Sequence, residues 1–534
     1  MTQTAEAGAL RADEFRARTI PDLLLHARAR HGARPALALR DPARGFSWTF
    51  DELTAFAAGV ARWLQAQGVE RGDRIVLWGP NEPAWGGTFF GALLVGAVVV
   101  PLDARNTPDF AARVAERTRA RLQVLGPAQQ PVPGVPALRF ADLPPLEPGI
   151  VPPEPVAAED DLAEIVFTSG TTGAPKGVMI THRNLVSNVR AMIEVVPILP
   201  SYRLLSLLPL SHMFEQAVGL GAALSGGASV VYMGTLRPDT IFEALAAERV
   251  TTILAVPQVL QLFQTAIERE VRRSGRERVW RLLHAVAPYV PFDLRRRLFA
   301  PVHARLGGNF LFFVCGGAYL DPALARAWEN IGIKVVQGYG ATEASPAIAA
   351  NSLAHRNLRS IGRPLSSNEV RLAPDGEIQV RGANVTPGYW EDPAATAAAF
   401  EGDWYCTGDL ARQDAAGYLY LIGRKKNMIV LASGENVYPE DVETVLAQQP
   451  GVRDAVVLGL TRPDSEVEVH AVLVATDADA AAAAVKAANR RLGIPQRVRG
   501  TTLWPDEDFP RTLTLKARRP EIEARVRALH PEYH

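Results

Sequence analysis

The sequence contains very little cysteine: only Cys315 and Cys406 occur in 534 residues. Two cysteines are too few for a framework of disulfides or for a zinc site built from cysteines. We therefore expect both to be reduced and to fill small apolar spaces.

A net charge and a long apolar stretch are also absent. The 57 basic residues balance the 57 acidic ones, so no global field favours nucleic acid or an anionic membrane. The longest apolar run, "FFGALLVGAVVVPL", is shorter than the ~20 residues that span a bilayer. The first residues lack the basic and then apolar order of a signal peptide. We expect a soluble, cytoplasmic protein that binds no nucleic acid and recognises its substrate locally.

Strand-like and helix-like patterns alternate in the first part of the chain. Between Thr49 and Gly68, Leu53, Phe56 and Val60 recur at helical spacing, and Thr49 with the glutamate three positions later has the form of a capping box. The runs that follow are "RIVLWGP", "VVVPLD" and "RLQVLG", separated by helical patterns. Continuous β-branched runs between helices indicate parallel strands covered on both faces. The fold class is therefore α/β, with parallel or mixed sheets.

The length leaves room for more than one domain, since a domain usually has ~150 residues. The pattern changes near "YLYLIGRKKNMIV". Beyond it follow a helix, two strands, an alanine-rich helix and a tail rich in proline and arginine. That is an α+β unit of about a hundred residues, a usual domain size. We expect a large domain over residues 1–422 and a small one over residues 423–534.

The stretch "TSGTTGAPKGV", Thr168 to Val178, follows the apolar run "LAEIVF". Hydroxyls and glycines behind a buried strand let backbone N–H groups approach an anion, as in a phosphate cradle. The P-loop pattern GxxxxGK[ST] does not fit, because Gly170 lies six residues before Lys176 and Gly177 follows. Taken alone, such a loop is more often an ordinary turn, so both interpretations stay open here.

Further motifs follow the loop in a fixed order. They are "PLSHMFEQ", "CGGAYL", "QGYGATEAS", "YCTGDL", "GRKKNMIVLASGENVYPEDVE" and "PRTLTLK". In this order and spacing the sequence resembles the AMP-forming adenylating enzymes: acyl-CoA synthetases, peptide-synthetase adenylation domains and firefly luciferases. The resemblance covers almost the whole chain, and "NVYPEDVE" with "TLTLK" is most similar to the long-chain fatty acyl-CoA synthetases. It implies that a carboxylate is joined to the α-phosphate of ATP, pyrophosphate leaves, and the acyl group passes to the thiol of CoA.

The resemblance assigns a role to each motif. It implies that the loop holds the β- and γ-phosphates of ATP. Tyr339 would lie flat on adenine, since glycines flank it. Thr342 would donate to the α-phosphate, and Glu343, a hard oxygen ligand, would hold Mg²⁺ against the phosphates. The phosphate-binding side chains would be Thr168, Ser169, Thr171, Thr172 and Lys176, with Gly170 giving mobility and Gly317 and Gly340 completing the nucleotide site.

Three residues further along complete the implied active site. Asp409 would accept both ribose hydroxyls, because a carboxylate offers two acceptor oxygens. Arg424 would reach the same ribose or the phosphate. Lys516 would carry a positive charge to the bridging oxygen between the carboxylate and the α-phosphate. The family often has glycine just before this lysine, where Leu515 stands here.

By the same resemblance, the small domain is mobile and turns about a hinge from Arg424 to Lys426. Gly434 would line the path of the CoA pantetheine. Because Lys516 and Gly434 are not expected to face one acyl-phosphate centre in a single pose, we expect two poses, one for each half-reaction.

The segment "PLSHMFEQ" indicates which class of carboxylic acid the enzyme activates. In the amino-acid-activating branch, an aspartate pairs with the substrate ammonium at the position of Met213, so amino acids are disfavoured unless Glu215 takes that role. His212 would lie next to the substrate carboxylate. The aliphatic segments "AVGLGAALSGGASVVYM" and "ILAVPQVLQLF" suit an acyl tunnel or an ordinary core equally. We expect a fatty acid, with chain length undetermined.

Other functions stay open at this point. The enzyme could load a carrier protein instead of CoA, or activate an aryl or other carboxylic acid. A catalytically silent nucleotide-binding scaffold predicts missing catalytic positions, whereas Lys176, Glu343, Asp409 and Lys516 are all present.

One segment, residues 268–305, is dense in arginine, with apolar residues at helical spacing. This pattern is typical of a helix on a membrane surface or against a partner, although a solvated amphipathic helix is commoner. Peripheral membrane contact is therefore a hypothesis for this segment, and the oligomeric state is open.

Overall fold

The computed structural model describes residues 9–168, 175–234, 237–431, 433, 435–462, 467–512 and 516–533. The chain divides into two compact units. The larger unit contains Met1–Glu369 and Val380–Tyr405, and the smaller unit contains Val370–Gln379 and Cys406–His534. None of the helices in the described ranges is long and apolar enough to cross a bilayer.

One sheet of the larger unit carries the predicted phosphate loop. Its strands are ordered β6 (Ala137–Arg139), β5 (Leu122–Leu125), β3 (Arg74–Gly79), β4 (Val98–Asp103), β7 (Leu162–Thr168) and β8 (Lys176–Thr181). All neighbours are parallel except β7 and β8, which form an antiparallel pair. Strands β4 and β5 are buried along their whole length, which confirms the interpretation of continuous apolar runs as covered parallel strands.

Helix α2 (Phe50–Ala66) of the larger unit begins where the capping box predicts. The Thr49 hydroxyl accepts from the backbone N–H of Glu52 at 3.2 Å, and the Glu52 carboxylate accepts from the backbone N–H of Thr49 at 2.7 Å. These two bonds satisfy donors that no helical carbonyl can reach. Helix α3 (Pro83–Leu94) packs against α2.

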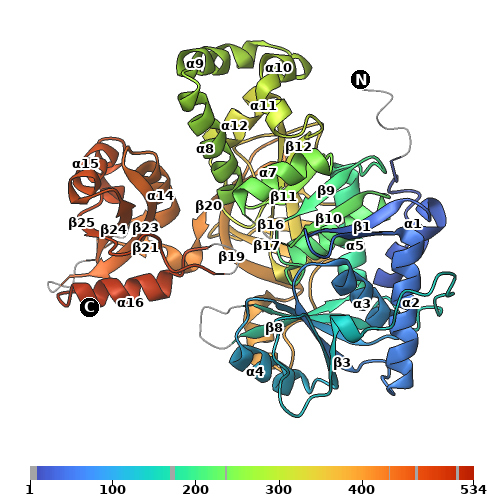
Figure 1. Ribbon diagram of the computed structural model, residues 1–534. Coiled ribbons are helices and arrows are strands. Elements are labelled where there is room, and N and C mark those ends of the chain that lie inside the picture. Colours follow the sequence, from blue (N-terminus) through green and yellow to red (C-terminus); the bar gives the residue numbers. More distant parts are fainter. Residues whose placement is uncertain are drawn as a thin grey trace. The chain divides into compact units, whose positions relative to one another are not determined.

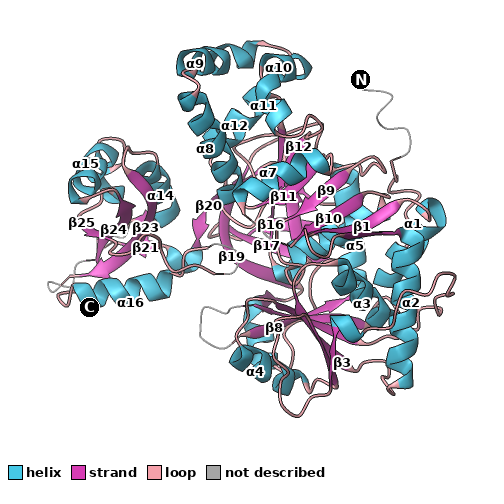
Figure 2. Cartoon of the chain, viewed as in Figure 1, coloured by secondary structure: helices cyan, strands magenta, loops and turns pink. Residues whose placement is uncertain are grey.

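A second sheet of the larger unit positions the "PLSHMFEQ", "CGGAYL" and "QGYGATEAS" motifs (Figures 1 and 2). Strands β10 (Ser229–Met233), β9 (Arg203–Ser206), β11 (Thr252–Ala255), β12 (Phe312–Cys315) and β13 (Lys334–Gly340) are neighbours in this order and run parallel. The sheet continues through β14 (Ala347–Ala350) and β15 (Arg363–Pro364) on one side, and β1 (Pro35–Arg40) and β2 (Phe46–Thr49) on the other. Parallel strands end at a common edge, where ligands of open α/β sheets usually bind.

Helices from residues 257 to 305 form a layer of their own in the larger unit. They are α8 (Pro257–Arg273), α9 (Glu277–Val286), α10 (Phe292–Leu298) and α11 (Ala300–Arg305). Figure 1 shows α9 and α10 beyond the end of α8, away from the strands of the second sheet. Their inner side chains pack against a core cluster that contains Phe263, Phe299 and Trp328.

The smaller unit has its own sheet and core. Strands β23 (Val452–Thr461) and β24 (Val467–Ala475) are antiparallel, and β25 (Gly500–Leu503) adds a parallel edge. Helices α14 (Pro439–Ala447), α15 (Ala478–Asn489) and α16 (Arg519–Leu529) belong to the same unit. The expected order of helix, two strands and alanine-rich helix is confirmed.

A chain of hydrogen bonds ties the last residues of the smaller unit to this sheet. His470 contacts Glu468 through Nδ1 at 3.3 Å and Thr502 through Nε2 at 2.8 Å. The Thr502 hydroxyl also contacts His530 Nε2 at 3.0 Å, and His530 Nδ1 lies 3.2 Å from Glu532. Two strands and the C-terminal segment are thereby joined through side chains.

The predicted fold class is confirmed: a large unit with mixed sheets and covering helices accompanies a smaller α+β unit. Both cysteines are free thiols, Cys315 buried and Cys406 half-buried. Burial strongly raises the pKa of the Cys315 thiol, so it stays protonated.

Candidate active site

The β7–β8 hairpin presents the first predicted site residues. Thr168 and Lys176 are paired across the two strands, and both side chains are half-buried. The Lys176 ammonium lies 4.9 Å from the centre of the Tyr389 ring, within the range of a cation–π contact. Ser169, Gly170, Thr171 and Thr172 lie outside the described residues.

Glu343 and Tyr389 form the next part of the site. The Tyr389 hydroxyl donates to Glu343 Oε1 at 2.9 Å, and the backbone N–H of Thr386 donates to the Glu343 carbonyl at 2.8 Å. Burial and the Glu343 carboxylate raise the pKa of Tyr389, so the phenol keeps its proton and remains a donor. Tyr389 therefore links the predicted phosphate-binding lysine to the predicted metal-binding carboxylate.

The carboxyl end of β13 carries Tyr339, Gly340 and Thr342. Tyr339 pairs with Ala349 of β14, and its side chain is half-buried. A Cβ at Gly340 would lie 1.8 Å from the carbonyl oxygen of Pro346, so only glycine fits there. The Thr342 side chain is half-buried beside Glu343 at the end of the strand.

The motifs around His212 and Gly317 meet at the same sheet edge. Gly317 follows β12, has φ +81° and is exposed. A Cβ at the preceding Gly316 would lie 3.4 Å from the carbonyl of Gly338 and 3.5 Å from the Phe214 ring. The "SHMF" and "CGG" segments and the end of β13 are thus in contact. The His212 side chain is half-buried, and its Nδ1 accepts from the backbone N–H of Phe214 at 3.3 Å.

Two side chains after His212 point into the protein. Met213 is fully buried in the main hydrophobic cluster. Glu215 is also fully buried at the start of a π-helical turn, Glu215–Ala222. Burial raises the pKa of Glu215 to about 8, so at pH 7 this carboxyl is mainly neutral and offers no charge to a substrate ammonium.

The smaller unit brings together four other predicted residues. Arg424 Nε donates to Asp409 Oδ1 at 2.8 Å, and Asp409 is 7% exposed. Lys426 lies in the single-turn helix Lys425–Asn427 directly after β20 (Leu419–Arg424). The charges of Arg424, Lys426 and Asp409 all act on Lys516. Gly434 lies outside the described residues.

The Lys516 ammonium is affected by these neighbours. Its side chain reaches solvent, but nearby atoms displace part of its water. This desolvation, together with the positive charges of Arg424 and Lys426, lowers the pKa of Lys516, while Asp409 acts in the opposite direction. The backbone is held by Thr512, whose N–H donates to the Lys516 carbonyl at 2.8 Å.

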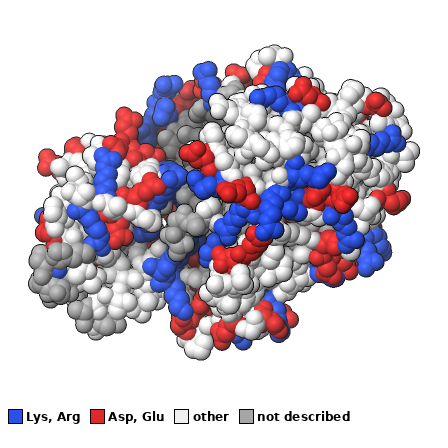
Figure 3. Space-filling view, turned by 90° about the horizontal axis from the view of Figure 1, so that it is seen from below, with Lys and Arg blue, Asp and Glu red and all other residues white. Residues whose placement is uncertain are grey.

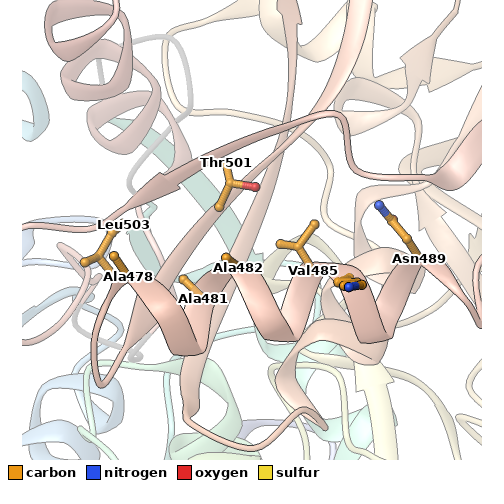
Figure 4. Close-up of a pocket in the computed structure, with 8 residues that line it drawn as sticks. Ala478, Ala481, Ala482, Val485, Asn489, Thr501 and Leu503 are labelled. Carbon is orange, nitrogen blue, oxygen red and sulfur yellow. The ribbon is translucent and has the colours of Figure 1, made fainter.

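A separate cavity of about 580 Å³ lies in the smaller unit between α15 and β25. Figure 4 shows Ala478, Ala481 and Val485 from the helix on one side and Thr501 and Leu503 from the strand on the other. None of the predicted site residues lines it.

Sequence reasoning missed Tyr389. The motif "VTPGYWEDP", a glycine followed by two aromatic residues, was the available signal. Its hydrogen-bond partner lies 46 positions away, and no local pattern connects two such residues.

Comparison with known families assigns the chain to the adenylate-forming ligases. Residues 24–390 match the profile of the AMP-binding enzyme family, and residues 426–525 match that of the AMP-binding enzyme C-terminal domain. The first match covers more than half of the chain, so the protein belongs to the AMP-binding enzyme family. It is an AMP-forming acid–thiol ligase that uses ATP and CoA.

Similar proteins differ in the acid that they activate. A feruloyl-CoA synthase of an Amycolatopsis species is 32% identical over 449 residues, which cover 81% of this chain and 84% of the relative. The long-chain-fatty-acid–CoA ligase FadD15 of Mycobacterium bovis is 30% identical over 463 residues, 78% of this chain and 76% of the relative. The solved structure of o-succinylbenzoate CoA synthetase from Bacillus subtilis, in complex with its acyl-adenylate intermediate, matches with a TM-score of 0.78 and 25% identity. The match covers 94% of this chain and 98% of that one.

Proposed function

We propose that the protein activates a long-chain fatty acid to an acyl-adenylate and transfers the acyl group to CoA. The observation that carries this proposal is the fully buried, apolar Met213 next to His212. A substrate ammonium would need a carboxylate there, and Glu215 is mainly neutral at pH 7. The aliphatic segment of residues 217–233 contributes buried side chains to the same cluster, whereas most of the buried side chains of residues 253–263 belong to a second cluster. The printed substrate of the FadD15 relative supports the same assignment.

In this proposal each cluster binds one part of the substrates. Lys176 and Thr168 hold the β- and γ-phosphates, Thr342 donates to the α-phosphate, and Tyr339 lies on adenine. Asp409 accepts from the ribose, and Arg424, held at 2.8 Å from Asp409, is oriented toward the same group. Lys516 neutralises charge that develops between the carboxylate and the α-phosphate.

A Mg²⁺ ion fits the residues around Glu343. The carboxylate is half-buried and is oriented by the Tyr389 hydroxyl on Oε1, and hard oxygen ligands suit this ion. When bound, Mg²⁺ would neutralise phosphate charge. Tyr389 keeps Glu343 aimed in one direction, and Lys176 adds a second positive charge.

A second candidate substrate class is an aryl carboxylic acid. The feruloyl-CoA synthase relative favours it, and the half-buried Phe214 beside Gly316 could stack on an aromatic ring. A carrier protein remains an alternative acceptor of the acyl group, and the cytoplasm remains the proposed location.

A pyrophosphate-release assay over an acid panel tests the proposal. We expect rates that rise with acyl length to an optimum, because each buried CH₂ contributes ~0.8 kcal/mol. Ferulate, benzoate and amino acids are the comparison acids, and CoA and a carrier protein are compared as acceptors. Faster turnover of ferulate than of any fatty acid would replace the proposal with the aryl alternative, and exclusive use of amino acids would refute both.

A further inference from the structure

The helix α9 carries apolar side chains on two sides. Trp280 points inward, and its ring meets the Phe299 ring edge-on at 5.6 Å between centroids. Val279, Leu282 and Val286 are 55%, 63% and 44% exposed. At 3.6 residues per turn, these three lie within a sector of about 60°. We call them the α9 ridge. Because Trp280 fixes the opposite side in the core, the ridge cannot turn inward.

The surroundings of the ridge are strongly basic. Residues 268–305 contain ten arginines and four carboxylates, a formal charge of +6, whereas the whole chain has none. Arg278 and Arg281 are exposed on α9 itself. On the face shown in Figure 3, by contrast, basic and acidic side chains lie side by side.

We propose that the α9 ridge and its arginines dock on the anionic surface of a lipid bilayer. The inference names a partner for the proposed function and rests on it, since long acyl chains reside in bilayers. An exposed aliphatic ridge can enter the headgroup region while arginines beside it bind lipid phosphates. Tyr289, 88% exposed after the end of α9, is a residue type that favours the same interface.

The charge and shape of the surface favour a bilayer over a protein partner. The three ridge side chains are aliphatic and are exposed on the outer face of one helix, whereas protein hot spots cluster in well-packed, desolvated pockets. Arginine stems can lie along the apolar layer and keep their charged heads among phosphates.

Sedimentation with sucrose-loaded vesicles tests whether the α9 ridge binds a lipid bilayer. The full-length protein should bind vesicles that contain phosphatidylglycerol at least about tenfold more tightly than vesicles of phosphatidylcholine alone, and less so as salt rises. Leu282→Glu should weaken binding by about tenfold or more, because it removes an inserting side chain and adds a repelled charge. Val151→Glu is the matched control, since Val151 is 71% exposed and lies outside residues 268–305. It should bind as the wild type does.

The arginines are tested separately. Arg278→Gln and Arg281→Gln should each weaken binding to the anionic vesicles by about fivefold, as expected for one basic residue near such a surface. Arg62→Gln removes an exposed arginine of α2 and should change nothing.

Catalysis is measured independently of lipid. All these variants should convert a short, soluble acid without vesicles at the wild-type rate, so a failure of the proposed function would not be mistaken for a failure of docking. Equal binding of wild type and Leu282→Glu to anionic vesicles would overturn the inference. It would also be overturned if sedimentation velocity showed that Leu282→Glu splits an oligomer while vesicle binding is unchanged, because a second copy would then cover the ridge.

Discussion

Tyr389 connects two residues whose roles the sequence predicts separately. Its hydroxyl donates to Glu343 and its ring lies under the Lys176 ammonium. Taken alone, Glu343 could be an ordinary carboxylate in a turn, and Lys176 an ordinary surface lysine. The tyrosine gives both a fixed position, which is what binding of a charged triphosphate requires.

Removal of the Tyr389 hydroxyl should therefore impair adenylation. We expect Tyr389→Phe to lower kcat/KM for pyrophosphate release about 10- to 100-fold, the effect of losing a hydrogen bond of ~1.5–3 kcal/mol to a charged group. Tyr420→Phe is the matched control, because the Tyr420 hydroxyl also donates to a carboxylate, that of Asp414 at 2.8 Å, which has no predicted role in the site. Equal rates for Tyr389→Phe and wild type would exclude Tyr389 from the site.

Helices and strands that are marked by a capping box or by a continuous apolar run could be predicted from the sequence. The capping box at Thr49 and Glu52 fixes the start of α2, and continuous β-branched runs give β3, β4 and β5. The π-helical turn Glu215–Ala222 was not predictable, because its apolar spacing differs little from that of an α-helix. The burial of Glu215 depends on its position near Ser206 of β9 and Tyr232 of β10, which sequence spacing does not reveal.

A buried histidine joins two helices and should make the larger unit sensitive to acid. His182, at the start of α5 (His182–Val195), accepts from the backbone N–H of Ile20, the first residue of α1 (Ile20–His31), at 3.1 Å. Burial lowers the pKa of His182 from 6.5 to about 4. The unfolded chain therefore binds a proton at a pH where the folded chain does not, and stability is lost as pH falls from 6.5 toward 4.

We expect this group to remove about 2 kcal/mol from the free energy of unfolding between pH 7 and pH 5. The measurement is the denaturant midpoint of the larger unit at both values, in the wild type and in His182→Gln. The variant should lose that part of the pH dependence. His26→Gln, on an exposed histidine of α1, should keep it. A His182→Gln protein with the full wild-type pH dependence would contradict the assignment.

At the scale of the whole molecule, the expected boundary at residue 422 and the hinge at Lys426 remain predictions. The compact units divide instead within β16 (Asn368–Leu372), β17 (Glu377–Gly382) and β19 (Trp404–Gln413). The sequence could not indicate this division, because it depends on which distant strands pair. Residues 426–525 match a separate C-terminal profile, which supports a domain that begins near the predicted boundary.

Mutation of Lys516 should impair acyl-adenylate formation without impairing thioester formation. Lys516→Ala should slow acyl-adenylate formation by roughly 100-fold or more, because a charge at the reacting oxygens is lost, yet it should still convert supplied acyl-adenylate and CoA to thioester. Lys486→Ala, a lysine of α15, is the control and should slow neither step. Single-turnover product analysis measures both steps. A folded Lys516→Ala protein that loses both equally would contradict the two-pose mechanism.

The hinge has its own test. Lys426 lies in a single-turn 3-10 helix, whose φ proline can adopt but cannot leave. Lys426→Pro should therefore support only one half-reaction in the protein that remains folded. Full activity in both half-reactions would show that Lys426 is not the pivot.

The hydrogen-bonded side chains from Glu468 to Glu532 can form all their bonds only with a particular number of protons. Its four links each need one hydrogen, and the ionised carboxylates at both ends can only accept. Two neutral imidazoles and one hydroxyl supply three hydrogens. The complete chain therefore exists only in molecules in which His470 or His530 carries an extra proton. In every other molecule one link is missing. Burial lowers the pKa of His470, so the proton that would complete the chain is disfavoured at that ring.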